Sequence, residues 1–177
     1  MPRNIEIKAR AADLADLEQR VKILAPHHSE QLRQDDTFFS SASGRLKLRV
    51  LAPQQGELIF YQRLDSAGPK TSFYVHSPTS DPDGLREALS LAHGQIGRVR
   101  KQRMVYLVGR TRIHLDEVEG LGNFVELEVV LADDEPVNAG EAEAHRLMQA
   151  LGIQESDLLG VAYLDLLSQD GRTTSVV

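Results

Sequence analysis

The most constraining feature of the sequence is a set of segments in which apolar residues alternate with charged ones. In residues 4–10, Glu6 and Lys8 alternate with isoleucines, and in residues 45–50 three basic residues alternate with leucine and valine. Because successive side chains of a strand point to opposite faces, each segment predicts a strand with one apolar and one charged face. Further strands place these residues on a charged face: Arg63, Lys101, Arg103, Arg112, His114, Asp116, Glu126 and Glu128.

Two arrangements could accommodate these charged faces. In the first, they are the solvated side of a sheet whose other side packs on helices. In the second, the strands close into a barrel with the charges inside. A solvated sheet would intersperse the two signs, whereas here basic and acidic residues sort into separate rows. Burying so many charges is costly unless a polyanion and metal ions join them. The sorting therefore favours a charged cavity.

The order of predicted elements indicates an α+β fold. Eight antiparallel strands can close into a small barrel, which the helices would flank. Asn138 and Ser156 are the expected N-caps of the last two helices. One domain is expected over residues 1–168, followed by a disordered tail at 169–177. Strands are predicted at 4–10, 35–40, 45–50, 57–64, 71–76, 98–108, 111–118 and 124–131, and helices at 13–24, 81–92, 138–152 and 156–167.

Composition excludes several classes of protein. The chain has no cysteine, which rules out disulfides and thiolate chemistry. It has no apolar run long enough for a membrane span, so a cytoplasmic protein is expected. The net charge of −6 argues against a broad nucleic-acid surface. Leucines on the last two helices, such as Leu147 and Leu166, leave a monomer or a homodimer open, and packing on the barrel exterior is the simpler interpretation.

The residue types on the charged faces point to phosphate and metal chemistry. Arginine binds phosphate through its bidentate fork and lysine as a point charge. Glu126 and Glu128, two residues apart, project from the same strand face and suit one hard divalent cation, Mg²⁺ or Mn²⁺. Glu6 could complete that set from the first strand. The predicted partner is a small molecule that carries a triphosphate.

An ordered series of motifs resembles the CYTH, or triphosphate tunnel metalloenzyme, superfamily. This superfamily includes class IV adenylyl cyclases, thiamine triphosphatases and inorganic triphosphatases. Its hallmark is an N-terminal Glu-x-Glu-x-Lys strand, which Asn4-Ile5-Glu6-Ile7-Lys8 matches except at its first position. The other matching stretches are Gly44-Arg45-Leu46-Lys47-Leu48-Arg49, Lys101-Gln102-Arg103, Leu115-Asp116, and Leu121-Gly122-Asn123-Phe124-Val125-Glu126-Leu127-Glu128.

The resemblance implies an eight-stranded tunnel and a role for each matching residue. It places Glu6, Glu126 and Glu128 at the principal metal and Asp116 near a second metal. Lys8, Arg49 and Asp116 are the residues expected to be catalytic. Asn4 replaces a carboxylate that helps to hold the second metal, so that site should be weaker. The residues expected to grip the phosphates are Lys8, Lys47, Arg49, Arg63, Lys101, Arg103 and Arg112.

The sequence leaves the reaction open. A metal-dependent triphosphate hydrolase is the first hypothesis. A class IV adenylyl cyclase that converts ATP to cyclic AMP and diphosphate uses the same cavity, and a non-catalytic binding module is a third possibility. Asp35 and Asp36 are interpreted as turn formers. His114 is interpreted as a structural, hydrogen-bonded histidine rather than a proton carrier, and Tyr163 either packs its helix or caps the substrate.

Overall fold

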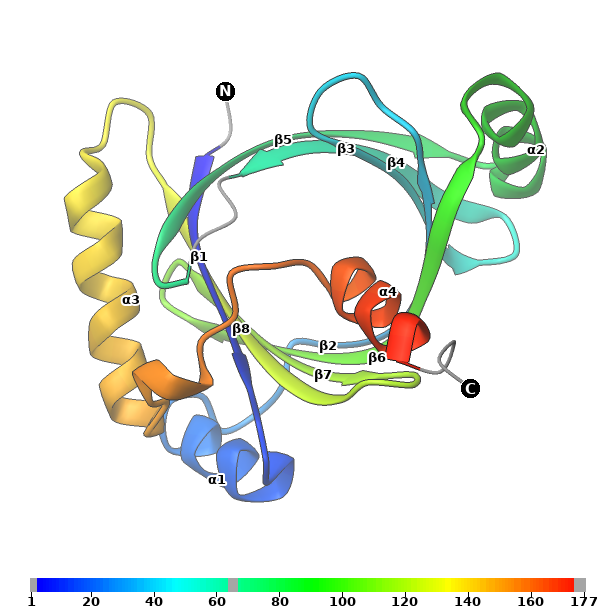
Figure 1. Cartoon of the computed structure of the whole chain (residues 1–177). Helices are drawn as coiled ribbons and strands as arrows, with labels where there is room; N and C mark the ends of the chain where they lie inside the picture. The colour runs from blue at the N-terminus through cyan, green and yellow to red at the C-terminus, as the bar shows by residue number, and fades with distance from the viewer. Residues whose placement is uncertain (1–2, 64–66, 174–177) are drawn as a thin grey trace.

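The computed structural model describes residues 3–63 and 67–173 of the chain. Its strands form one closed antiparallel barrel in the order β1-β5-β4-β3-β2-β6-β7-β8 (Figure 1). The α+β fold and the eight-stranded barrel are therefore confirmed. The strands are β1 Arg3–Arg10, β2 Glu30–Phe39, β3 Arg45–Ala52, β4 Gln55–Arg63, β5 Lys70–Thr79, β6 Gln95–Val108, β7 Thr111–Val118 and β8 Gly122–Leu131. The helices are α1 Leu14–Leu24, α2 Pro82–His93, α3 Val137–Leu151, the 3-10 turn η1 Glu155–Asp157, and α4 Tyr163–Thr173.

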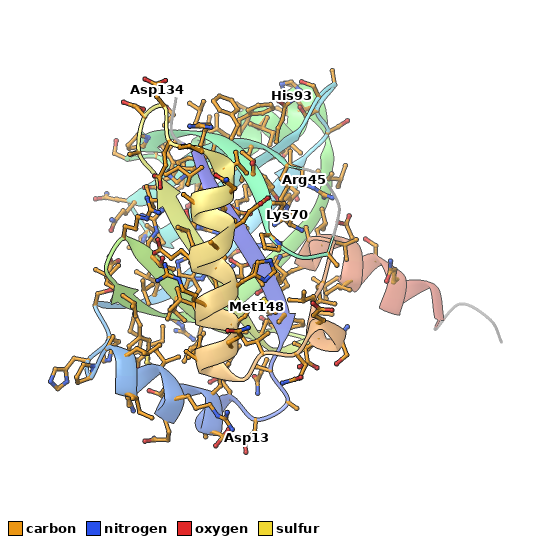
Figure 2. The ribbon with its side chains drawn as sticks, turned by 90° about the vertical axis from the view of Figure 1, so that its left-hand side faces the viewer. Asp13, Arg45, Lys70, His93, Asp134 and Met148 are labelled. Atoms are coloured by element: carbon orange, nitrogen blue, oxygen red, sulfur yellow. The ribbon has the colours of Figure 1, made fainter. Side chains whose placement is uncertain are left out.

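The main apolar core lies outside the barrel wall. The outward faces of β1 and β8 pack against α1 and α3, burying Ile5, Ile7 and Leu127 together with Leu147 and Leu151 of α3. Figure 2 shows α3 running along the outside of β1. Packing of this helix on the barrel exterior, the simpler expectation, is confirmed. Burial of these apolar faces leaves the opposite, charged faces to line the interior.

A second apolar cluster fills one end of the barrel. Phe38, Val99 and Phe124 point inward near this end and pack against Tyr163 and Leu164 of α4, all five being buried. Figure 1 shows α4 lying across the opening.

Leu164 packs directly on Gly97, where a β-carbon would collide with its side chain. An ion pair of 2.7 Å between Arg45 and Asp165 also ties the helix to β3.

Several predicted boundaries of the helices were wrong. Pro136, not Asn138, precedes α3, and it makes no side-chain cap. Ser156 is not an N-cap but lies inside the η1 turn, and Gln154 is the N-cap of that turn. The chain is then extended, with an isolated bridge from Leu158 to Ala9, before α4 begins.

The C-terminal expectations are only partly covered by the described residues. Helix α4 continues to Thr173, beyond the end expected near residue 167. Of the expected tail, residues 174–177 lie outside the described residues, as does Leu64, the last residue of the strand expected at 57–64. None of the helices in the described part of the chain is long and apolar enough to cross a membrane.

Candidate active site

The interior of the barrel forms a cavity of about 440 Å³. The end of the barrel opposite α4 is open and is bordered by exposed residues, among them Glu30, Gln55 and His76. Every residue predicted from the sequence to bind phosphate or the principal metal lines this cavity. These are Glu6, Lys8, Lys47, Arg49, Arg63, Lys101, Arg103, Arg112, Glu126 and Glu128.

Asp116 lies on the inward face of β7, buried beneath the side chains that line the cavity, and organises two of its cations. Its side chain is fully buried, and its carboxylate accepts two hydrogen bonds from Arg103, of 2.7 and 2.6 Å. Lys101 lies 3.4 Å away, and the Tyr163 hydroxyl donates a third hydrogen bond of 2.9 Å. Burial alone would raise the pKa of Asp116, but Arg103 and Lys101 hold it far below its usual range. In this arrangement Asp116 positions cations; its expected place beside a second metal stays a prediction.

Asp36 has the equivalent task on β2, two strands away from Asp116 in the barrel, and the sequence pattern did not reveal it. It was interpreted as a turn former, but it lies in the middle of β2, directly opposite Arg49 of β3. Its buried carboxylate accepts two hydrogen bonds from Arg49 and one from Lys47, each of 2.8 Å. Both phosphate-binding candidates on β3 are therefore held in place before any ligand arrives.

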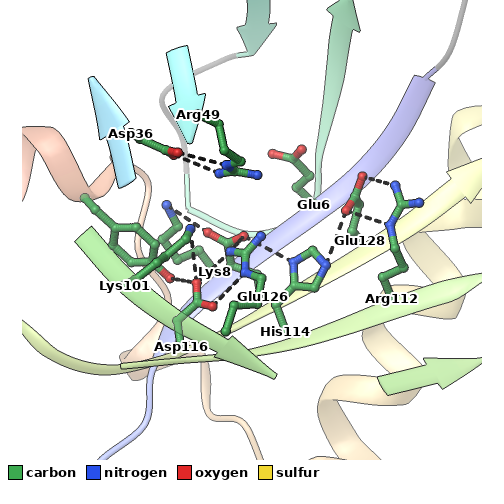
Figure 3. Close-up of polar contacts among 12 residues, drawn as sticks. Glu6, Lys8, Asp36, Arg49, Lys101, Arg112, His114, Asp116, Glu126 and Glu128 are labelled. Atoms are coloured by element: carbon green, nitrogen blue, oxygen red, sulfur yellow. Dashed lines mark hydrogen bonds and ion pairs between the residues drawn. The ribbon is translucent and has the colours of Figure 1, made fainter. Parts of the chain in front are cut away.

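The three predicted metal ligands are each paired with a cation. Glu126 contacts Lys8 at 3.2 Å and Arg103 at 2.8 Å (Figure 3). Glu128 accepts two hydrogen bonds from Arg112 and one from the amide of Asn4, and Glu6 lies 3.2 Å from Arg63. These carboxylates thus neutralise the lysines and arginines of the cavity, which were expected to be neutralised by a bound anion.

The neighbouring cations do not fully neutralise the three glutamates. In the β1–β8 register Glu6 stands directly opposite Glu128, and like charges in such pairs repel. Burial raises the pKa of Glu6, and the nearby Glu126 and Glu128 add to the rise although Arg63 opposes it. By contrast, Lys8 and Arg103 outweigh burial at Glu126 and lower its pKa well below the usual range. A positive charge between the glutamates would relieve this repulsion.

The donor set fits a divalent cation. Besides the three carboxylates, four buried side-chain atoms of residues that line this cavity have no hydrogen-bond partner: Oδ1 of Asn4, Oε1 of Gln34, Nε of Arg63 and Nδ1 of His114. The amide oxygens and the imidazole nitrogen are atoms that can bind a cation. Within residues 3–63 and 67–173, however, no three acidic or histidine side chains are already grouped as a metal site. The carboxylates are drawn instead toward their cations, which must be released before the oxygens can converge on an ion.

His114 and Tyr163 occupy defined positions in the cavity wall. Burial and the neighbouring Arg103 lower the pKa of His114, which favours its neutral form. The ring of Tyr163 lies 3.9 Å from Nζ of Lys8 and 4.8 Å from Nζ of Lys101, within the range of cation–π interactions. Tyr163 thus does more than pack its helix; contact with a substrate stays a prediction.

Comparisons with known proteins extend these observations. The model of the CYTH domain family matches residues 2–163. The adenylate cyclase CyaB of Aeromonas hydrophila is 24% identical over 174 residues, which cover 93% of this chain and 88% of that protein.

Two solved structures share the fold. The PH1012 protein of Pyrococcus horikoshii has a TM-score of 0.82 at 22% identity, covering 92% of this chain and 98% of that one. A Hippeastrum protein, HpAC1, described as a candidate adenylyl cyclase with a dominant triphosphatase activity, has a TM-score of 0.65 at 18% identity. It matches 100% of this chain and 98% of its own.

Proposed function

The chain belongs to the CYTH domain family, and from this we propose that it is a metal-dependent phosphohydrolase that binds a triphosphate in its barrel. The observation that carries the proposal is the inner wall, where buried lysines and arginines are held by Asp36 and Asp116. Such a wall binds a polyanion because the cations are already positioned and largely stripped of water. Inorganic triphosphate and nucleoside triphosphates both carry the required charge.

Exchange of ion-pair partners explains how the cavity can load. Without a ligand, Lys8 and Arg103 neutralise Glu126, and Arg112 neutralises Glu128. Phosphate oxygens are competing acceptors for the same cations. As the cations turn to phosphate, Glu126 and Glu128 become available to hold Mg²⁺ or Mn²⁺ with Glu6. Metal and triphosphate should therefore each strengthen binding of the other.

The chain's own residues then have separate tasks. Lys8 and Arg49 neutralise negative charge that develops on the reacting phosphate, while Asp36 and Asp116 keep the cations aligned. The bound metal supplies further charge neutralisation at phosphate oxygens. Water attacks the terminal phosphorus, the bond from that phosphorus to the bridging oxygen breaks, and orthophosphate forms, the protons of water ending on the two products. The diphosphate part of the substrate is the leaving group and is held by the cationic wall until it is released. The substrate is a small molecule rather than a nucleic acid, because the cations face the barrel interior. We place the activity in the cytoplasm, in a protein that is a monomer or a homodimer.

Adenylyl cyclase activity is the second candidate, favoured by the likeness to CyaB. The two are separated by incubating the protein with Mg²⁺ or Mn²⁺ and either inorganic triphosphate or ATP, and resolving the products. Orthophosphate is expected. Cyclic AMP with diphosphate would establish the cyclase instead, and metal-assisted binding without any product would leave a binding module.

Asn4→Glu is expected to raise turnover about tenfold with KM changed by less than about twofold, because a carboxylate is a better ligand for a hard cation. In the wild type the Asn4 amide donates a hydrogen bond to Glu128, so the side chain already faces the carboxylate cluster. Steady-state kinetics with Mn²⁺ measure the change. Asn4→Gln is the control, since it has the same length without the charge. No gain in rate for Asn4→Glu would contradict this account of position 4.

Triphosphate affinity is expected to fall from about pH 7, where burial and Arg103 place the pKa of Lys101, and to fall further above about pH 8 as Lys47 loses its proton. Burial lowers the pKa of Lys47 to about 8, the neighbouring Arg49 adds to this, and Asp36 opposes it. Above that pH the free protein must take up a proton before Lys47 can bind phosphate as a cation. Between about pH 8 and the unperturbed lysine pKa the unfolded chain binds more protons, so the free energy of unfolding rises over the same window.

Calorimetric titration with inorganic triphosphate from pH 7 to 10 tests this dependence. Lys47→Arg keeps its charge throughout and should lose affinity less steeply than the wild type above pH 8. Parallel curves for the two proteins would show that Lys47 does not titrate in this range.

A further inference from the structure

The imidazole of His114 lies deep in the cavity among lysines, arginines and carboxylates. His114 of β7 is 6% exposed and stands opposite Glu126 in the β7–β8 register. Figure 3 shows its ring between Glu126 and Glu128. Nδ1 lies 3.5 Å from Oε2 of Glu126, and Nε2 lies 3.7 Å from Oε2 of Glu128. Both ring nitrogens thus face a carboxylate predicted to hold metal.

The two nitrogens are not equivalent. Nδ1 is buried and has no partner in good hydrogen-bond geometry, although the Glu126 oxygen lies 3.5 Å away. The expected structural, hydrogen-bonded role of His114 therefore stays a prediction. A neutral imidazole carries one N–H and one lone pair. With the proton on Nε2, toward Glu128, the lone pair of Nδ1 faces the Glu126 oxygen. Two acceptors then oppose each other inside the protein, an arrangement that is unfavourable until a cation lies between them.

We propose that Nδ1 of His114 joins Glu126 in binding the divalent cation, and that this nitrogen makes the site prefer Mn²⁺ and Co²⁺ over Mg²⁺. The inference rests on the proposed function, to which it adds a ligand and a metal selectivity. Adjacent ligand atoms of an octahedral divalent cation of this kind lie about 3 Å apart. Nδ1 of His114 and Oε2 of Glu126 are now 3.5 Å apart, so little movement would be needed. Imidazole suits first-row transition metals, whereas Mg²⁺ prefers oxygen ligands. The second nitrogen facing Glu128 matches the carboxylate contact common in metal-binding histidines.

Pulsed electron paramagnetic resonance of Mn²⁺ bound to the untagged full chain tests the assignment directly. The protein is frozen with Mn²⁺ alone and with Mn²⁺ plus inorganic triphosphate, and nitrogen-14 coupling to the manganese is recorded. Coupling from a directly bound nitrogen is expected in the wild type and should disappear in His114→Asn, which retains an oxygen donor of similar reach. Because the wild-type spectrum carries the main result, the test does not depend on how well the variant folds.

His76→Asn is the matched control, since His76 lines the same cavity but its side chain is 44% exposed and its Nδ1 lies 3.3 Å from Glu57. This variant should keep the nitrogen coupling. His114→Asn should also lower Mn²⁺ affinity about tenfold in calorimetry while Mg²⁺ affinity changes less than about twofold.

Bound Mn²⁺ without nitrogen coupling, or coupling lost in His76→Asn instead, would overturn the inference and leave the carboxylate metal site intact. Failure to bind Mn²⁺ under either condition would overturn both the inference and the metal dependence of the proposed function.

Discussion

Replacing Glu126 and Glu128 together by glutamine is expected to lower metal-dependent turnover at least about 100-fold while the barrel stays folded. The two side chains lie on one face of β8 within the cavity, and glutamine keeps their size while removing both negative charges. Arg103 retains Asp116 as its partner, and Arg112 is partly exposed to water. Lys8 loses its ion pair with Glu126 but keeps its contact with the Tyr163 ring, and the amide oxygen of a glutamine can still accept its hydrogen bond. Turnover with Mn²⁺, Mn²⁺ binding and the circular dichroism melting curve together measure the outcome.

Glu57→Gln provides the matched control for this experiment. Glu57 also lines the cavity, but its partner is His76 rather than a buried lysine or arginine. Its replacement should change turnover less than about twofold because its charge is far less buried among cations. Retained activity in the double glutamine variant would refute the assignment of Glu126 and Glu128 as metal ligands.

Asp116→Ala is expected to cause the largest loss of stability, about 3–5 kcal/mol in the free energy of unfolding. The side chain is fully buried and is the shared partner of Arg103, Lys101 and Tyr163. Removing it leaves two buried cations close together with one fewer counter-charge, and it also removes a contact that holds α4 over the end of the barrel. Chemical denaturation at neutral pH measures the effect.

Asp35→Ala separates this loss from that of an ordinary ion pair. Asp35 accepts two hydrogen bonds of 2.6 Å from Arg98, but both side chains are partly exposed to water. Its removal should cost about 1 kcal/mol or less. If the two variants lose similar stability, the buried network around Asp116 contributes no more than a surface pair and the present description of it is wrong.

The fold could be predicted from the sequence largely because the alternation is so regular. Charged residues alternate with apolar ones in β1 and β8, and the apolar residues form the outward face that α3 covers. The same alternation marks β3. The two-residue turn between β6 and β7 follows the two flanking strand patterns and contains Gly109, whose positive φ suits a tight turn. Helix ends were less predictable because Pro136 and Gln154 are unusual capping residues.

Site residues were predictable where they lie within a clear strand pattern. They were unpredictable where one residue type serves two functions, as aspartate does in turns and in buried ion pairs. Asp36 was missed because Asp35-Asp36 resembles a turn and the polar stretch before it hides the start of β2 at Glu30. The expected strand at 35–40 already has Asp36 in phase with Phe38, but only a strand extended back to Glu30 moves Asp36 away from the strand end, where turn formers are common. The lack of a partner for Nδ1 of His114 depends on side-chain geometry across three strands, which alternation alone does not encode.

In the described part of the chain, the apolar filling at the α4 end makes the cavity a dead end rather than a passage. Among residues 3–63 and 67–173, Phe38, Val99 and Phe124 block that end, and a ligand enters and departs by the opposite opening. A phosphate chain can therefore be admitted only by its terminus, and a long polymer cannot be threaded through and cut internally. Products must leave by the route along which the next substrate arrives, so a diphosphate product that lingers on the cationic wall would compete directly with substrate.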